Sequence, residues 1–269
     1  MGLYNNQSRQ ETLEALLGVL ESDQRVDGVI LVGSGAYGFK DELSDIDLAV
    51  VVSRGLDALA VFRDWESRIR NLLPILWCFV DVRGPEVGLY AIVLEDFLEV
   101  DISFQSLSVL SARSAHWKVL LDRTGQIQDI LCKSWTEHTE PNLEALYARR
   151  LGSIWHYVIH VAVSIKRGHL WRATHYLEEI RNRTIELEGL VCNRQTRHFR
   201  EVDQLPADRL ASLERTLPAR LECDELARAL HAATDCFFET AARIDRICGS
   251  KQSDTLREAM EQYLSLMSF

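Results

Sequence analysis

Apolar and polar positions divide the chain into two halves with different periods. Up to about residue 106, short apolar runs favour strands, and two segments of helical period lie among them. Strands are expected at 26–32, 46–52, 75–82, 89–94 and 97–104, and helices at 8–22 and 56–72. Ser8, with Glu11 three residues on, is the expected N-cap of the first helix. This half therefore predicts a mixed sheet flanked by helices.

After residue 106 the apolar positions follow a helical period. Helices are expected over 106–121, 142–168, 170–191, 208–215, 222–247 and 254–267. The expected breaks between them include Gly168, Pro206, Pro218 and Gly249. The change of pattern near residues 125–140 predicts an α+β fold with two domains. The first, over 1–125, holds the mixed sheet, and the second, over 126–269, is an all-α helical bundle.

Composition and charge narrow the class of protein. The 269 residues are 47% hydrophobic, which is enough for a sizeable core, and the formal net charge is -10 at pH 7. Nucleic-acid backbones are bound by clustered positive charge, so a nucleic-acid partner is not expected. The acidic balance suits general solubility, or a small cationic partner.

The N-terminus and the cysteines indicate a cytoplasmic setting. The first residues contain no apolar core of the signal-peptide type, and no apolar run reaches the ~20 residues of a membrane span. The six cysteines form no C-x-x-C pair, and several stand inside apolar runs. We therefore expect reduced thiols, no disulfide framework and no membrane partner.

A glycine-rich loop, "GSGAYG" at 33–38, follows the first expected strand and matches G-x-G-x-x-G. A dinucleotide-binding fold would place a crossover helix of about a dozen residues or more after this loop. Here only residues 39–44 precede the next strand, which is too short for that helix. The Walker pattern fails as well, because no Gly-Lys-Ser or Gly-Lys-Thr follows. The loop therefore predicts a different phosphate site.

Two aspartates stand where the second expected strand begins. Asp45 and Asp47 are two residues apart, so their carboxylates share one face of an extended segment, as a shared divalent cation would need. Asp101 has the same setting inside the strand at 97–104, and Asp81 is a competing third carboxylate in the strand at 75–82. For either of these two, an ordinary edge-strand aspartate is the alternative. Unpaired charges inside apolar strands are costly unless a metal or ligand compensates them.

The loop and the carboxylates together predict one reaction site. Backbone N–H groups of the loop and the Ser34 hydroxyl are suited to hold triphosphate oxygens, and Gly33 and Gly35 let the backbone approach closely. A short helix is expected to start at 36–39. Asp45 and Asp47 are expected to bind Mg²⁺, which offsets charge as pyrophosphate leaves. Asp101 is the candidate third metal ligand or the base for a substrate hydroxyl.

The Gly-Ser turn, the "SDIDL" segment and a later third acid resemble the DNA-polymerase-β-like nucleotidyltransferase superfamily. The stretches at 120–131 and 153–182, with the general plan of a transferase domain and a helical bundle, resemble lincosamide and aminoglycoside nucleotidyltransferases more closely. The resemblance implies transfer of a nucleoside monophosphate, such as AMP from ATP or another NTP, to a hydroxyl of a small acceptor. Two Mg²⁺ ions, a homodimer, and an acceptor held between domain and bundle are also implied.

The sequence departs from many relatives in the loop, where Tyr37 and Gly38 replace an Arg-Gly pair. Positive charge for the phosphates is therefore expected elsewhere. The candidate residues are Lys40, Lys166, Arg167 and Arg172. For the last three, a solvated helix end with a favourable dipole interaction is the alternative.

For two further features of the helical half, a structural role is the favoured interpretation. His156 and His160 are four residues apart, as in some zinc sites, but H-E-x-x-H is absent and no third ligand is evident. The aromatic residues Trp155, Tyr157, Trp171 and Tyr176 are expected to pack in the bundle core, with a ligand wall as the alternative.

Two other functions stay open. One is a regulatory or toxin–antitoxin type of nucleotidyltransferase that modifies a protein or an RNA end, which a basic acceptor groove would favour. The other is a scaffold that binds a nucleotide without turnover, although three costly carboxylates would have no purpose there.

Overall fold

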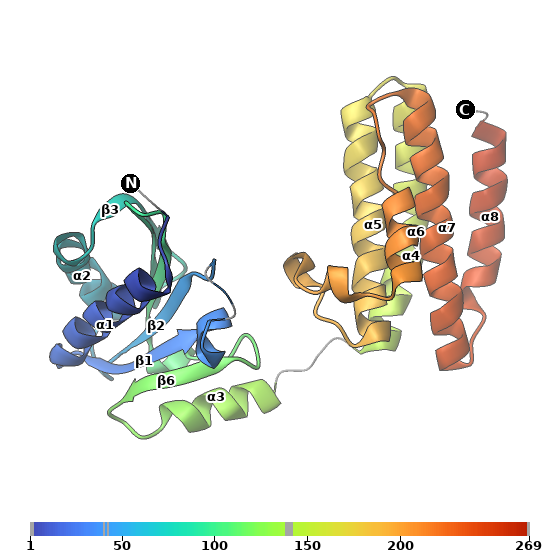
Figure 1. Ribbon diagram of the computed structural model, residues 1–269. Coiled ribbons are helices and arrows are strands. Elements are labelled where there is room, and N and C mark those ends of the chain that lie inside the picture. The colour runs from blue at the N-terminus through green and yellow to red at the C-terminus, as the bar shows by residue number, and fades with distance from the viewer. Residues whose placement is uncertain (1–2, 40, 42, 138–141, 268–269) are drawn as a thin grey trace. The chain divides into compact units, whose positions relative to one another are not determined.

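The computed structural model describes residues 3–39, 41, 43–137 and 142–267 (Figure 1). The chain forms two compact units, Met1–Thr139 and Glu140–Phe269. The boundary therefore lies later than the predicted 125/126. The reason is helix α3 (Ile127–Thr136), whose buried Ile127 and Leu131 pack against Ile30 and Val51 of the sheet.

The N-terminal unit is built on a six-stranded mixed sheet with the order β3-β4-β5-β2-β1-β6. The strands are β1 (Val26–Val32), β2 (Ile46–Val52), β3 (Ile75–Val82), β4 (Val87–Leu94), β5 (Glu99–Ser106) and β6 (Trp117–Asp122). The β2–β5 pair is parallel and the other pairs are antiparallel. Five of these strands follow the sequence prediction closely, and the predicted mixed sheet flanked by helices is confirmed.

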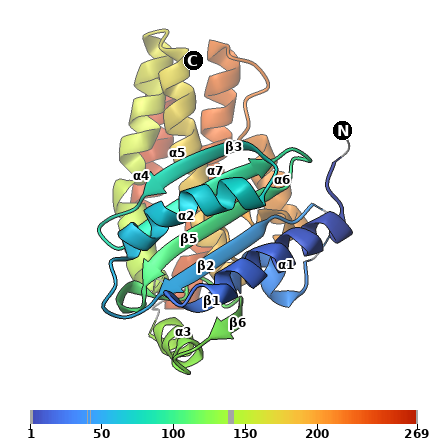
Figure 2. The same ribbon diagram turned by 90° about the vertical axis from the view of Figure 1, so that its left-hand side faces the viewer.

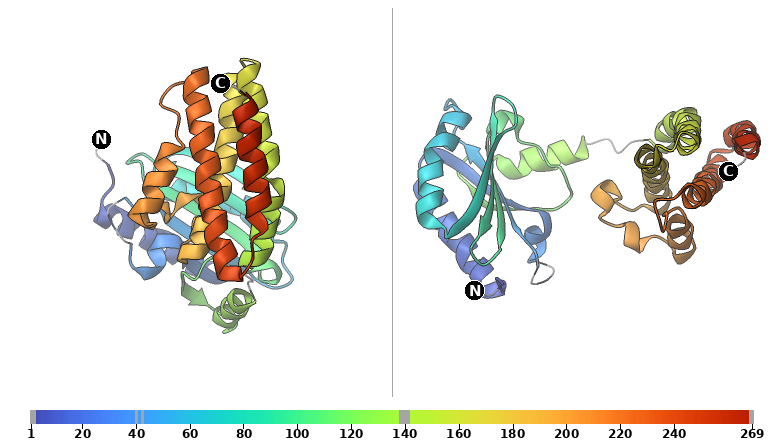
Figure 3. Two further views of the ribbon diagram at one scale, coloured as in Figure 1. Left: turned by 90° about the vertical axis from the view of Figure 1, so that its right-hand side faces the viewer. Right: turned by 90° about the horizontal axis from the view of Figure 1, so that it is seen from above.

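Helices cover the two faces of this sheet unequally. Figure 2 looks onto α1 (Asn6–Ser22) and α2 (Ala58–Leu72), which lie over one face. Seen from above, α3 lies on the opposite face (Figure 3). Leu16, Trp65 and Ile69 are fully buried between the two long helices and the strands, so the main core of this unit is on the α1 and α2 side.

The predicted cap of the first helix is wrong by three residues. Asn5 is the N-cap, and its side chain accepts hydrogen bonds from the backbone N–H groups of Gln7 and Ser8. Ser8 instead occupies the third helical position, where its hydroxyl accepts from the Asn5 N–H at 3.0 Å. Both residues thus form one capping box, and the reciprocal bonds favour the earlier start.

The helix predicted over 106–121 is wrong. This segment contains a short 3₁₀ turn (Leu107–Val109) and then β6, which pairs antiparallel with β1. An apolar run such as Val119, Leu120 and Leu121 fits a buried strand or a helix equally well by its pattern. The free edge of β1 decides, because pairing there satisfies backbone groups of both strands.

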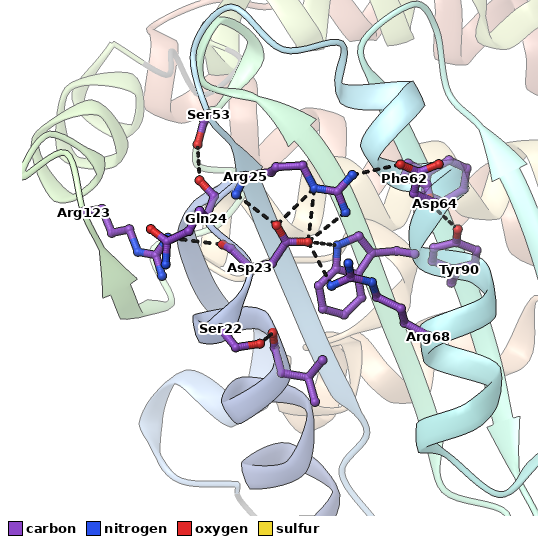
Figure 4. A network of polar contacts seen from close by, with 12 residues as sticks. Ser22, Asp23, Gln24, Arg25, Ser53, Phe62, Asp64, Arg68, Tyr90 and Arg123 are labelled. Carbon is purple, nitrogen blue, oxygen red and sulfur yellow. Dashed lines mark hydrogen bonds and ion pairs between the residues drawn. The ribbon is translucent and has the colours of Figure 1, made fainter.

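A polar network joins the end of α1 to α2 on the helix-covered side (Figure 4). The buried Asp23 carboxylate accepts hydrogen bonds from Arg25 at 2.8 and 3.0 Å and from the Trp65 indole at 3.0 Å, and Arg68 contributes at 3.2 Å. The hydrogen bond from Arg25 is the main cause that lowers the pKa of Asp23 to about 2. This network therefore has a structural role, and its charges are paired.

The second unit is all-helical, as predicted, with α4 (Leu143–Lys166), α5 (Leu170–Cys192), α6 (Ala207–Arg215), α7 (Cys223–Cys248) and α8 (Gln252–Met267), and two short 3₁₀ turns (Arg197–Phe199 and Val202–Gln204). Its core is separate, with Ile154, Leu177 and Phe237 fully buried. Within the described residues of both units, the helices are too short or too polar to cross a membrane.

Candidate active site

The Gly-Ser turn leaves the end of β1 as a 3₁₀ helix (Gly33–Tyr37), slightly earlier than the short helix predicted at 36–39. Gly33 has φ 66°, and a Cβ placed on it would lie 2.6 Å from Oδ2 of Asp47. The positive φ favours glycine at this position, and the missing side chain leaves room for the carboxylate. Gly35 is buried, and an added Cβ would meet Leu31 and Phe39 at 3.0 Å. Both glycines therefore fit the close packing around the turn.

Strand register places two of the predicted carboxylates next to each other. Val32 of β1 pairs with Asp47 of β2, and Asp47 pairs with Asp101 of the parallel strand β5. Residues in register on neighbouring strands are about 5 Å apart and share a face. Asp45 lies just before β2, two residues from Asp47. The end of β1, the turn and the acidic residues thus lie at the same end of these three inner strands.

Asp81, the competing third carboxylate, lies elsewhere. It is on β3, the edge strand, and β4 separates that strand from β5. Its carboxylate is also paired with Arg83 at 2.9 Å. Asp101, in contrast, stands in the same row as Asp47. Of the two alternatives, the tertiary structure brings only Asp101 to the turn.

Asp101 differs from the buried Asp23 of the same unit because one of its carboxylate oxygens has no partner in the described part of the chain. Its Oδ1 atom is buried and has no hydrogen-bond partner among the described residues. Burial raises the pKa of Asp101, and the negative charges of Glu99 and Asp45 raise it further, against a smaller opposite effect of Arg83. The hydroxyl of Ser34 is likewise buried without a partner in the described part of the chain. These polar atoms have the character of ligand-binding groups.

The donor set fits a hard divalent cation, since Asp45, Asp47 and Asp101 offer carboxylate oxygens. In the described ranges, no three His, Cys, Asp or Glu side chains stand close enough together to enclose a metal ion. Like-charged carboxylates repel each other, and a bound cation would draw them together. We therefore treat these three residues as the candidate metal ligands of this unit.

Arg9 of α1 holds the segment that leads into β2. Arg9 is 3% exposed, and its guanidinium donates to the backbone carbonyls of Asp41 at 3.0 Å and Ser44 at 2.9 Å. The same group lies 4.1 Å from the centre of the Phe39 ring and donates to the Asn6 side chain. A charged side chain from a remote helix thus fixes the backbone directly before Asp45.

We expect Arg9→Met to lower the free energy of unfolding by about 2–3 kcal/mol, because buried carbonyls would lose charged donors. Denaturant unfolding monitored by circular dichroism measures this loss. Arg63→Met is the matched control, since Arg63 is an exposed arginine on α2. A change of less than about 0.5 kcal/mol in Arg9→Met would show that the segment is held without this side chain.

The predicted basic residues belong mainly to the other unit. Lys166 is the last residue of α4, and Arg172 lies in the first turn of α5, with its guanidinium 5.6 Å from the centre of the Tyr176 ring. Arg167 caps α4. Lys40 lies outside the described residues. Lys166, Arg167 and Arg172 therefore belong to the C-terminal unit, whereas the glycine turn belongs to the N-terminal unit.

One residue beside the turn, His116, was missed in the sequence analysis. The Tyr37 hydroxyl lies 3.0 Å from Nδ1 of His116, and the two rings meet edge to face. Both side chains are exposed. His116 directly precedes β6, so the wrong helix prediction for this segment concealed it. A histidine before a short apolar run is the only signal that the sequence offers.

The histidine and tryptophan side chains of the helical unit lie partly outside its core. The rings of His156 and His160 are 4.2 Å apart. Trp155 is 45% exposed and Trp171 is 79% exposed, so the predicted core packing is wrong for both. Tyr157 and Tyr176 are partly buried against the core, as predicted. The tryptophans occupy surface positions of their helices, which the period alone did not separate from the core stripe.

Comparison with known proteins places this geometry in a family. The family model described as streptomycin adenylyltransferase matches residues 6–267. A solved structure of an aminoglycoside 6-adenyltransferase from Bacillus subtilis is similar at 13% identity and a TM-score of 0.47, covering 96% of this chain and 98% of that one. Among curated proteins, none matches the sequence. The relationship to antibiotic nucleotidyltransferases is confirmed, and the chain belongs to the streptomycin adenylyltransferase family.

Proposed function

We propose that this protein transfers AMP from Mg–ATP to a hydroxyl of a small cationic antibiotic of the aminoglycoside class, and releases pyrophosphate. Membership of the streptomycin adenylyltransferase family supports the nucleotide transfer. One observation carries the proposal for this chain. Asp47 pairs in register with Asp101 and with Val32, the residue directly before the Gly33 turn. The net charge of -10 suits a cationic acceptor.

Each residue of the site has a role in this reaction. Asp45, Asp47 and Asp101 would hold Mg²⁺, which when bound offsets negative charge on the phosphate oxygens. The hydroxyl of Ser34 and the backbone N–H groups of the turn donate to the phosphates. Asp101, whose pKa is raised by burial, is suited to accept the proton of the acceptor hydroxyl. The acceptor oxygen then bonds to the α-phosphorus. At the same time, the bond between the α-phosphorus and the oxygen that leaves with pyrophosphate breaks.

Mass spectrometry tests this function directly. The purified protein is incubated with Mg²⁺, each of the four NTPs and a panel of aminoglycosides and lincosamides. We expect one added nucleotide on a hydroxyl of a cationic acceptor, and equal amounts of pyrophosphate. Nucleotide binding without transfer to any acceptor would favour the scaffold instead. Transfer to a protein or an RNA end, with none to small molecules, would favour the regulatory alternative.

A further inference from the structure

Strand β3 exposes two aromatic side chains on the same sheet face as the carboxylates. Cys78 and Val80 pair with Ile92 and Tyr90, which are buried on the α2 side. Because side chains alternate along a strand, Trp77 and Phe79 point to the other face. Trp77 is 73% exposed and Phe79 is 58% exposed. Large apolar side chains exposed side by side are typical of binding surfaces.

The strand register connects these rings to the acidic site. Phe79 pairs with Ala91, Ala91 with Asp101, and Asp101 with Asp47, so all four stand in one row across the sheet. Two strand spacings, about 10 Å, separate Phe79 from Asp101. Ala91 lies between them, and its small methyl group leaves space above the sheet at this position. This distance suits one or two sugar-sized rings.

A second row runs parallel to the first. Trp77 pairs with Val93, and Val93 pairs with Glu99, whose carboxylate is exposed. Each row thus has an aromatic ring on β3, a smaller apolar side chain on β4, and an acid on β5. Apolar ring surface beside negative charge is complementary to a molecule that has both C–H faces and ammonium groups.

We propose that Trp77 and Phe79 form an acceptor platform, on which a ring of the cationic acceptor stacks while its hydroxyl reaches Asp101. This inference rests on the proposed function and assigns the acceptor-binding residues of the same site. Glu99 attracts the ammonium groups and fixes the direction in which the molecule lies. A second copy of the chain is the less favoured occupant, because two such faces would bring like charges together.

Calorimetric titration of streptomycin, in the presence of Mg²⁺ and a non-hydrolysable ATP analogue, tests the platform without turnover. We expect Trp77→Ala and Phe79→Ala each to raise the Kd by about tenfold. The conservative variants Trp77→Phe and Phe79→Tyr should retain most of the affinity. Val82→Ala is the matched control, because it removes exposed apolar surface from the opposite face of the same strand. Its Kd should equal that of the unmodified protein, as should the nucleotide affinity of every variant.

The possible failures are distinguishable. Unchanged Kd values in both alanine variants, with transfer intact, overturn the platform and leave the proposed function standing. Loss of a dimer in Trp77→Ala, measured by light scattering and accompanied by unchanged streptomycin affinity, identifies a second copy as the occupant and also overturns it. If the unmodified protein neither binds nor modifies any aminoglycoside, the proposed function fails and the platform fails with it. Circular dichroism confirms that each variant is folded.

Discussion

Asp47→Asn is expected to reduce nucleotide transfer by at least about a thousandfold, equivalent to about 4 kcal/mol in the activation barrier. The carboxylate stands at the meeting point of the site, beside Gly33 and in register with Asp101. An amide in its place has the same shape but no charge, so it cannot balance a divalent cation. Initial rates of pyrophosphate release, measured with the acceptor found by mass spectrometry, give the loss.

The control for this variant is Asp81→Asn. It makes the same chemical change on the edge strand, where Asp81 is partly exposed and paired with Arg83. Surface ion pairs contribute little, so we expect its rate to stay within about twofold and its stability within about 1 kcal/mol. The metal assignment is refuted if Asp47→Asn keeps substantial turnover, or if Asp81→Asn loses as much activity as Asp47→Asn.

Asp101→Asn is expected to abolish transfer and to stabilise the protein at neutral pH. The buried Oδ1 atom has no partner within the described chain, and burial raises the pKa of this carboxyl in the folded state. A raised pKa of an acid means that its ionised form destabilises the folded protein. Replacing it with a neutral amide removes that cost, which we expect to amount to about 1 kcal/mol.

The pH dependence of this stabilisation follows from the same shift. Below the ordinary pKa of aspartate, about 4, the carboxyl is neutral in both folded and unfolded protein, and no electrostatic difference remains. As the pH rises past the raised value of the folded state, the full cost of the ionised group appears in the unmodified protein. Urea unfolding of both proteins between pH 4 and pH 8 should therefore show a growing advantage for Asp101→Asn. A destabilised variant at pH 7 would contradict the burial argument.

Local features of the chain were enough to predict most elements and the acidic turn. Continuous apolar runs gave the strand at 46–52, and the spacing of Asp45 and Asp47 placed both carboxylates on one face of its start. The helical period of the apolar residues predicted the long helices of the second unit to within two positions at either end. These features are local because strand alternation and helix period depend only on neighbours within the same segment.

Contacts between distant segments decided the rest. Asp81 and Asp101 show the same alternation along their strands, and only the strand order places Asp101 beside Asp47 and Asp81 at the edge. Pairing with the free edge of β1 made the apolar run at 117–122 a strand, β6. The same pairing placed His116 next to Tyr37. The sequence by itself thus determined which side chains carry charge and which segments are strands or helices. The tertiary structure alone decided which charges meet, because strand partners are chosen by pairing and burial over the whole unit, and no local pattern records that choice.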